Sequence, residues 1–275
     1  MDRDDIECRP HTAWAIHIFS SLGILAGFLG LLSVLDGSPR AALTWLLVAM
    51  IIDGLDGPIA RRYEISRVIP HIDGNSLDLM IDYVCCVVAP ALFLHRFHML
   101  PGDNYVSLSC VGLILTSSLY VMSNKDIQTE DSYFNGFPAM WNVVVNALFA
   151  LQARPWISVA VIVVLVVFTF VPLKFVHPIR VKDFRNVTIP VLAVWLAAML
   201  YVTWILDERI AGCSRGCLGV AEEAAQGAIY AGAAWIVGVG VWRTVRGAPP
   251  SSPALADGQG KNAAAASSSS SGTVA

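Results

Sequence analysis

The sequence predicts an all-α fold, a polytopic membrane helix bundle of about eight transmembrane helices. Of the 275 residues, 56% are hydrophobic and only 14% are charged. That is more apolar material than a soluble domain of this length can bury. The apolar residues also come in long runs, and roughly 20 helical residues are enough to cross a bilayer core about 30 Å thick. The net charge of −3 gives no sign of nucleic-acid binding.

Eight apolar runs have the length of a membrane span. The first run is longer than the apolar core of a signal peptide and is not followed by a clear small-residue cleavage site. We therefore expect it to be retained as a membrane helix. From residue 247 the composition turns to Pro, Ser, Ala and Gly, which predicts a membrane domain over 1–246 and a disordered cytoplasmic tail over 247–275. The expected spans are 12–35, 39–60, 77–97, 104–122, 137–153, 156–176, 186–206 and 224–243.

The basic residues predict the orientation of the bundle. With eight spans both termini lie on one side, and that side carries 13 of the 18 Lys and Arg residues. The positive-inside rule therefore places both termini in the cytoplasm, together with the loop that joins the second and third spans. On the opposite side, Cys213 and Cys217 share a polar loop, where either a disulfide or two free thiols is compatible with the sequence.

Four aspartates lie near membrane depth in the second and third runs. Asp53 and Asp56 fall toward one face at the end of the second, and Asp78 and Asp82 share a face at the start of the third. A loop of about fifteen residues joins the two runs, so antiparallel neighbours would bring both carboxylate pairs to one level. The face of Asp53 also carries Gly57, Ala60 and Arg61.

Carboxylates gathered in this way require a counter-charge. An Asp at the centre of a membrane helix costs roughly 2.5–3.5 kcal/mol, and four together also repel one another. Hard dications such as Mg²⁺ and Mn²⁺ prefer oxygen ligands and commonly bridge to substrate phosphates. The small residues Gly57 and Ala60 leave room for a backbone or a pyrophosphate. The plainer interpretation is a set of carboxylates that cap helix ends.

The spacing of these residues resembles the signature of the CDP-alcohol phosphotransferase family. Eight positions agree over thirty residues, which is far more specific than a single short motif. The spacer 62–73 has twelve residues where most of the family has eight or nine, and it resembles the bacterial phosphatidylcholine synthase branch, as do the segments 135–142 and 172–180. The matching positions are Asp53, Asp56, Gly57, Ala60, Arg61, Gly74, Asp78 and Asp82.

The resemblance implies a role for each matching residue. Asp53, Asp56 and Asp78 would coordinate two Mn²⁺ or Mg²⁺ ions, and Asp82 would contact metal and serve as the catalytic general base. The CDP moiety would lie among Gly57, Ala60, Arg61 and Gly74. Asp82 would take the proton of the choline hydroxyl, and the alkoxide would attack the phosphatidyl phosphorus of CDP-diacylglycerol and release CMP. The resemblance also implies a bacterial inner-membrane enzyme and a homodimer.

A choline site needs aromatic faces or a carboxylate, because a quaternary ammonium cannot donate hydrogen bonds. The sequence offers several aromatic side chains at the expected cytoplasmic helix ends, and spacing does not choose among them. Trp141 is also an ordinary interfacial aromatic residue. The candidates are Tyr63, Tyr83, Tyr120, Tyr133, Phe134, Phe137 and Trp141, and the residues selected as substrate-binding are Tyr83, Trp141 and Arg180.

Two kinds of alternative remain open at this point. The first alternative is another enzyme of the same class. It would use serine, inositol or glycerol phosphate in place of choline as the acceptor, or it would transfer phosphocholine to diacylglycerol. In a different class, the aspartates carry an ion through a cation transporter. The intervals of the small and basic residues argue against a transporter, which would not require them.

Overall fold

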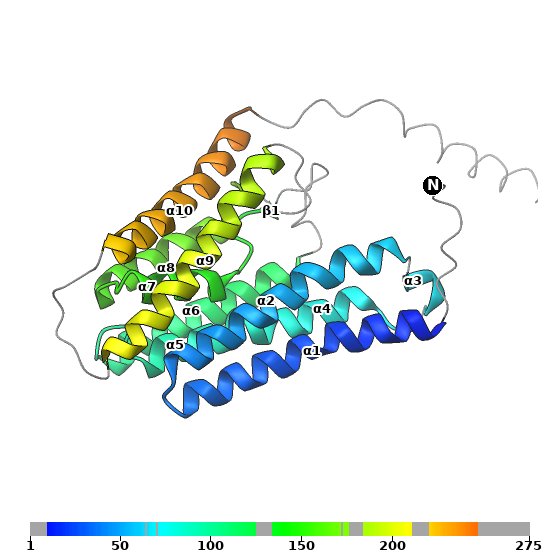
Figure 1. Cartoon of the computed structure of the whole chain (residues 1–275), viewed down its shortest axis with the longest axis horizontal. Helices are drawn as coiled ribbons and strands as arrows, with labels where there is room; N and C mark the ends of the chain where they lie inside the picture. Colours follow the sequence, from blue (N-terminus) through cyan, green and yellow to red (C-terminus); the bar gives the residue numbers. More distant parts are fainter. Residues whose placement is uncertain are drawn as a thin grey trace, which may run out of the picture.

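The computed structural model describes residues 10–63, 65–69, 71–124, 134–171, 173–175, 184–210 and 220–246. Within these ranges the chain is almost wholly helical (Figure 1). The described part also contains two strands of two residues each and the turns and loops that join the elements. The predicted all-α membrane bundle is therefore confirmed. The predicted tail and the Cys213 and Cys217 loop lie outside the described residues.

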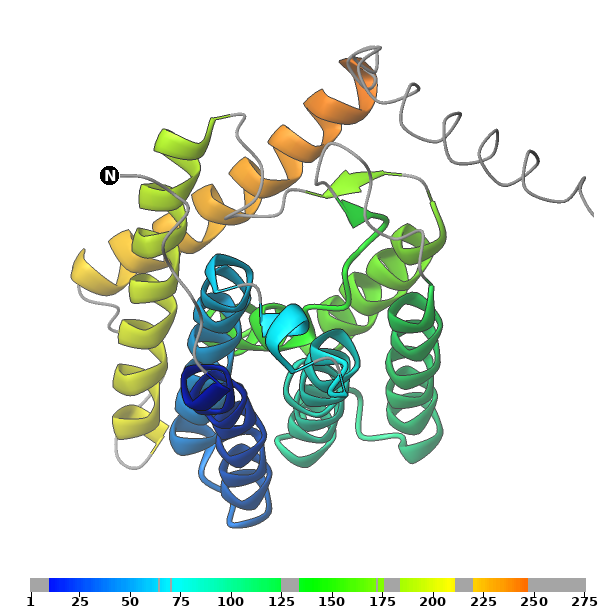
Figure 2. The ribbon, with the colours of Figure 1, turned by 90° about the vertical axis from the view of Figure 1, so that its right-hand side faces the viewer.

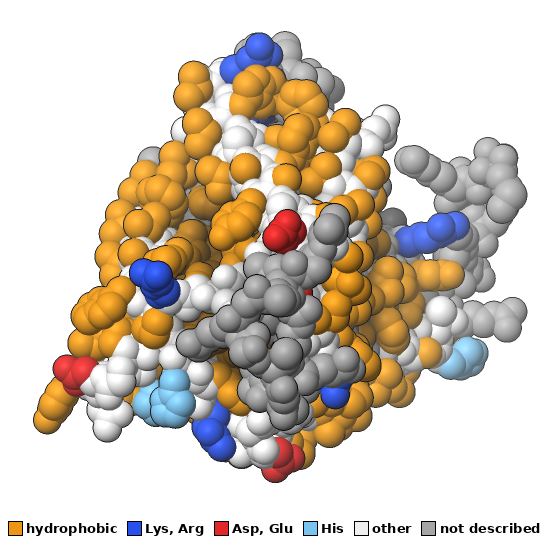
Figure 3. All heavy atoms as spheres, turned by 60° about the vertical axis from the view of Figure 1, so that its left-hand side comes forward, with side chains coloured by type: hydrophobic (Ala, Val, Ile, Leu, Met, Phe, Trp, Pro, Cys, Tyr) orange, Lys and Arg blue, Asp and Glu red, His pale blue; other side chains and the backbone are white. Residues whose placement is uncertain are grey.

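Among the described residues, six helices are long and apolar enough to cross a membrane. The third of them is continuous from Gly74 to Arg96 and contains a π-helical segment, η1. Hydrophobic side chains predominate among the described side chains on the face seen in Figure 3, as expected of a surface in contact with lipid. The six are α1 (Pro10–Leu35), α2 (Pro39–Arg62), the composite of α4 (Gly74–Asp82), η1 (Tyr83–Val88) and α5 (Ala89–Arg96), α6 (Asn104–Ser123), α9 (Arg185–Ile210) and α10 (Val220–Arg246).

The fifth and sixth apolar runs form helices shorter than predicted. They are α7 (Trp141–Ala150) and α8 (Pro155–Phe170). With a rise of 1.5 Å per residue, the ten residues of α7 extend about 15 Å, half of a bilayer core. Residues 137–140 are not helical, and Ala139 has a left-handed backbone with φ 57°. Hydropathy alone does not reveal this, because the non-helical residues are themselves apolar.

Helices α7 and α8 follow one another in the chain, and the segments that flank this pair are joined by backbone hydrogen bonds. There β1 (Phe134–Asn135) pairs antiparallel with β2 (Lys174–Phe175), and the Gly136 N–H donates to the Leu173 carbonyl at 2.8 Å. Gly136 has φ +89°, and a Cβ there would lie 2.5 Å from the Thr169 carbonyl oxygen. Only glycine fits this position. Helix α7 contacts α2, η1, α5 and α9 in the middle of the bundle, whereas α8 packs against α6.

The long helices surround this centre. Helices α1 and α2 are antiparallel neighbours joined by a turn at 36–38, and both contact the composite third helix (Figure 2). Helix α9 packs beside α2, and α10 packs against α9. A short helix, α3 (Ile65–Val68), lies in the connection between α2 and α4. The end of α2 and the start of α4 therefore lie at the same end of the bundle, here called the aspartate end.

The π-helix η1 begins directly after Asp82. Its wider turn is closed by the Ala89 N–H, which bonds to the Val84 carbonyl five residues earlier. Gly27 of α1 faces this segment so closely that a Cβ on it would overlap the Sγ atom of Cys85, whereas the Cys85 Cβ would be 3.7 Å away. The thiol is buried and lies 3.4 Å from the Gly23 carbonyl oxygen. Close contact between α1 and η1 therefore depends on the pairing of a glycine with a cysteine.

We expect Gly27→Ala to destabilise the protein by about 1–3 kcal/mol, the usual cost of overpacking a core. Cys85→Ala removes the overlapping atom, so the double variant should be more stable than the sum of the two single effects predicts. Thermal unfolding in detergent, followed by tryptophan fluorescence, measures this. Gly112→Ala is the matched control, because a Cβ there meets no atom within 4 Å. Additive effects in the double variant would contradict the packing described.

Candidate active site

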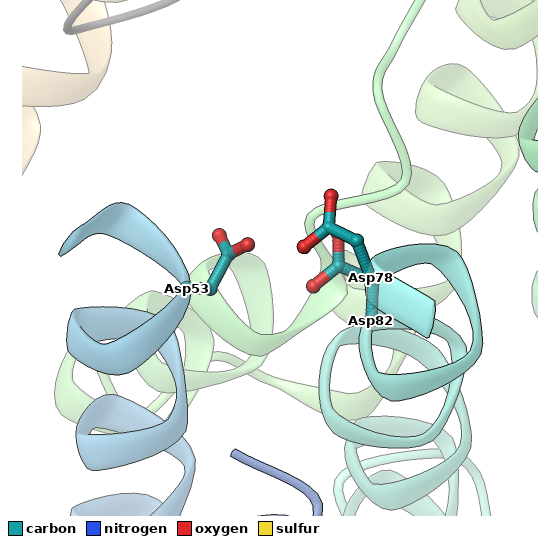
Figure 4. Close-up of side chains that lie close together, drawn as sticks. All are labelled: Asp53, Asp78 and Asp82. Carbon is teal, nitrogen blue, oxygen red and sulfur yellow. The ribbon is translucent and has the colours of Figure 1, made fainter. Parts of the chain in front are cut away.

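Three of the predicted aspartates meet at the aspartate end. One carboxylate oxygen from each of Asp53, Asp78 and Asp82 lies within 4.8 Å of the others, and all three side chains are half-buried. Asp53 projects from α2 and the other two from α4, so that the carboxylates point toward one another across the gap between the helices (Figure 4). The antiparallel arrangement expected from the sequence thus does bring the two runs together.

The start of α4 fixes the register of its two aspartates. Asp73 is the N-cap, and its carboxylate accepts hydrogen bonds from the Asn75 N–H at 3.1 Å and from the Ser76 hydroxyl. The Ser76 hydroxyl, and after it the Asn75 N–H, hold the pKa of the exposed Asp73 carboxyl below its ordinary value. Asp78 and Asp82 follow at a spacing of four, which places both on one face of α4.

Asp56 does not join the group of three. Its side chain is only 7% exposed, and its carboxylate interacts with the Ser20 hydroxyl, the Gly57 backbone and the Arg61 guanidinium. A spacing of three residues turns a side chain by about 60° from the direction of the first. The carboxylate of Asp56 consequently points toward α1 and its own helix, although its charge still acts on Asp82.

The small and basic residues of the motif lie around Asp56 and the start of α4. The Arg61 guanidinium folds back over Gly57, where a Cβ would be 3.2 Å from Nη1. Ala60 is half-buried and packs against a small apolar cluster that includes Ala13 and Ile16 of α1. Gly74, the first residue of α4, faces the His17 imidazole. Gly57 and Gly74 therefore let the Arg61 guanidinium and the His17 imidazole come close to the helix backbone near the carboxylates.

The residues selected as substrate-binding lie in different surroundings. Tyr83 follows Asp82 directly, is half-buried, and donates its hydroxyl to the Leu115 carbonyl at 3.2 Å. Trp141 is 0% exposed, and its indole N–H donates to Ser118 Oγ at 2.8 Å. Arg180 lies outside the described residues.

Sequence reasoning missed two polar residues of α1 beside the site, His17 and Ser20. Both lie on the face of α1 that contacts α2 and α4, with Ser20 against Asp56 and His17 against Gly74. The sequence feature that could have identified them is a pair of polar residues three positions apart in an otherwise apolar run. This spacing puts both side chains on one helix face. The first span therefore forms a third wall of the site.

The donor set of the cluster fits a hard divalent cation. Asp53, Asp78 and Asp82 supply oxygen ligands only, and these are close enough to converge on a shared ion. Mg²⁺ and Mn²⁺ prefer such ligands and are commonly held by a few carboxylates together with substrate phosphates. An ion would also relieve the repulsion among the three carboxylates.

Comparison with known proteins agrees with this site. The profile of the CDP-alcohol phosphatidyltransferase family matches residues 14–239, a range that contains all eight positions of the signature. The chain belongs to the CDP-alcohol phosphatidyltransferase family. The match runs from the first turns of α1 to the last turns of α10, so the membrane bundle is the family domain. Members of this family generally use divalent metal ions, and this CDP-alcohol phosphatidyltransferase has a cluster of three carboxylates whose oxygens lie within 4.8 Å of one another.

Several curated relatives carry the name phosphatidylcholine synthase. The protein from Pseudomonas aeruginosa is 39% identical over 85% of this chain and 92% of its own length. That from Agrobacterium fabrum is 36% identical over 75% of this chain and 89% of its own. That from Borreliella burgdorferi is 32% identical over 71% and 82%, respectively. This CDP-alcohol phosphatidyltransferase is therefore a multi-pass membrane transferase of phosphate-linked groups.

Proposed function

We propose that this protein condenses CDP-diacylglycerol with choline to give phosphatidylcholine and CMP. The observation that carries the proposal is the cluster of Asp53, Asp78 and Asp82 in a chain that aligns with curated phosphatidylcholine synthases over most of its length. The longer spacer between Arg62 and Asp73, which forms α3 and the N-cap of α4, also supports this branch of the family.

The cluster would provide both metal ligands and the base. Asp53, Asp78 and Asp82 would hold divalent cations, Mn²⁺ or Mg²⁺. Asp56 would become a further ligand of a two-ion site by rotating from Ser20 and Arg61 toward the cluster. When bound, such ions neutralise charge that develops on the phosphates and on the departing CMP. Asp82 would accept the proton of the choline hydroxyl as the oxygen attacks the phosphorus. Its position next to the π-helix η1 fits this role, since π-helical turns are frequent at functional sites.

Arg61 and the glycines would bind the diphosphate. The guanidinium of Arg61 lies over Gly57 and interacts with Asp56, and these three residues span about one and a half turns of α2. A diphosphate that lies along Gly57 and Ala60 would accept hydrogen bonds from this guanidinium, which donates in a planar fork suited to phosphate. Gly74 would leave room for the same substrate on the α4 side.

Choline would be recognised by its charge and by aromatic faces. Tyr83 is the proposed aromatic contact, because it follows Asp82 and its ring is half-exposed. Trp141 would act indirectly by holding the start of α7 against Ser118 of α6. Arg180 stays a proposed contact for a lipid or nucleotide phosphate. The negative carboxylate cluster would add attraction for the quaternary ammonium.

The orientation and assembly remain proposals as well. The aspartate end would face the cytoplasm of a bacterial inner membrane, because the positive-inside rule assigns to that side the predicted loops and termini that carry most Lys and Arg residues. Residues 1–246 would form the membrane domain and 247–275 a disordered cytoplasmic tail. A homodimer is the proposed assembly.

Acceptor specificity tests the proposed function. The purified protein in lipid nanodiscs with Mn²⁺ and CDP-diacylglycerol should release CMP when choline is added, and labelled choline should appear in phosphatidylcholine. Serine, inositol and glycerol phosphate in parallel reactions should give no release above background, and CDP-choline with diacylglycerol should give no product. Faster CMP release with any other alcohol contradicts the choline assignment. Metal uptake into vesicles without CMP release would instead support the transporter alternative.

A further inference from the structure

His17 is a buried, titratable side chain that the mechanism above does not use. It is 9% exposed, and its Nε2 atom has no hydrogen-bond partner in the structure. The edge of the Trp14 indole lies against the imidazole, with ring centroids 6.5 Å apart. Nearby, Ala13 and Ile16 of α1 pack with residues of α3 in a small apolar cluster.

An unpaired nitrogen at this position is costly. A buried donor or acceptor without a partner destabilises a protein by about 1–3 kcal/mol. In a membrane span such a group is by default a functional-site hypothesis. An apolar side chain would satisfy the packing of the cluster around Ala13 and Ile16 without that cost. The presence of a histidine at this position is therefore better explained if the bound substrate supplies the hydrogen-bond partner that Nε2 lacks.

The position of His17 points to the polar part of the donor substrate. Its Cε1 atom, bonded to Nε2, lies 3.7 Å from where a Cβ would stand on Gly74. Gly74 precedes Asp78 by one turn on the same face of α4, so the imidazole lies about 5–6 Å along that helix from the carboxylate cluster. Ser20, the next polar residue on this face of α1, contacts Asp56. His17 thus adjoins the space that a phosphate chain leaving the cluster would enter.

We propose that His17 binds the CDP part of the donor, with Nε2–H donating a hydrogen bond to an oxygen of the diphosphate. The inference rests on the proposed function for the identity of the donor. Gly74 has no side chain between the imidazole and this space, so a small movement of the ring reaches the ligand. The contact supplies the partner that Nε2 lacks. It would bind the nucleotide and leave the choline site unaffected.

Binding of CDP to the full-length protein in nanodiscs with Mn²⁺, measured by titration calorimetry, tests this proposal. His17→Phe keeps an aromatic ring and should weaken CDP binding about tenfold. It should raise the KM for CDP-diacylglycerol and leave the KM for choline unchanged. His17→Gln retains an N–H donor and should recover part of the affinity. Ser21→Ala is the control, because the Ser21 hydroxyl bonds within α1 to the His17 carbonyl at 2.8 Å.

Gly74→Ala gives an independent test should His17→Phe fail to fold. The new methyl group would make an ordinary contact of 3.7 Å with the imidazole, so thermal stability should stay near that of the wild type while CDP affinity falls. Wild-type CDP affinity in a stable His17→Phe or Gly74→Ala protein overturns the proposal. Wild-type protein that binds CDP through His17 but uses another alcohol contradicts only the choline assignment.

Discussion

Replacement of Asp82 by Asn is expected to lower the rate of CMP release by about 10³-fold. The carboxylate of Asp82 lies within 4.8 Å of those of Asp53 and Asp78, so it can act as both general base and metal ligand. Loss of a general base alone typically costs 10²–10⁴-fold. Asn keeps the size of the side chain but has no basic oxygen. The assay is CMP release from CDP-diacylglycerol with saturating choline and Mn²⁺.

Stability separates this effect from misfolding. Asn removes one of three like charges, so the metal-free Asp82→Asn protein should be at least as heat-stable as the metal-free wild type. Asp73→Asn is the matched control, because Asn caps a helix as well as Asp does and residue 73 lies outside the cluster. It should retain full activity. An Asp82→Asn protein with more than a tenth of wild-type activity would show that another group is the base.

Removal of divalent metal is expected to abolish activity and to lower thermal stability together. Without a cation the carboxylates of Asp53, Asp78 and Asp82 repel one another in a half-buried site. Dialysis against a chelator should therefore reduce CMP release by more than about 10²-fold, and Mn²⁺ or Mg²⁺ should restore it. A cation that binds only the folded protein also raises the unfolding temperature as its concentration rises.

The Asp78→Asn variant connects this effect to the cluster. With one ligand neutralised, added Mn²⁺ should raise the unfolding temperature much less than it does for the wild type. Activity that survives exhaustive chelation, or an equal stabilisation of Asp78→Asn by Mn²⁺, would mean that the cation acts elsewhere. Either result would contradict the assignment of the three carboxylates as the metal site.

The convergence of Asp53, Asp78 and Asp82 could be predicted from the sequence for a physical reason. Helical periodicity places Asp78 and Asp82 on one face, and a connection too short to leave the aspartate end places that face beside α2. Hydropathy located the six long helices because backbone hydrogen bonds must be satisfied inside a lipid bilayer. These inferences depend on spacing and length, which the sequence states directly.

Other features depend on contacts between distant segments. Asp56 turns away from the cluster because Ser20 and Arg61 offer it partners, and Ser20 belongs to a different helix. Helix α7 is short because its first turn is preceded by a left-handed Ala139 and a backbone bond from Phe137 to Phe168 of α8. The hydrophobic pattern of residues 137–153 contains no sign of either contact.

The local geometry around Asp82 shows the same dependence. Neither the π-helix η1 nor its close contact with Gly27 follows from periodicity, since the composite third helix looks like a regular apolar span. His17 could have been noticed as a polar residue in an apolar run, but its buried, unpaired nitrogen appears only once α1 and α4 are packed together. Pairwise packing across helices is what the sequence leaves open.

Electron paramagnetic resonance of bound Mn²⁺ tests most directly whether the aspartate cluster is the metal centre. Purified protein in nanodiscs, loaded with Mn²⁺ and CDP, should lose the six-line signal of free Mn²⁺ and show the broadened spectrum of two coupled ions, which lie about 3.5–4 Å apart in two-metal sites. Asp53→Asn should restore the free-ion signal at the same Mn²⁺ concentration. An unchanged free-ion spectrum in the wild type, or full Mn²⁺ binding in Asp53→Asn, would contradict a metal site formed by Asp53, Asp78 and Asp82.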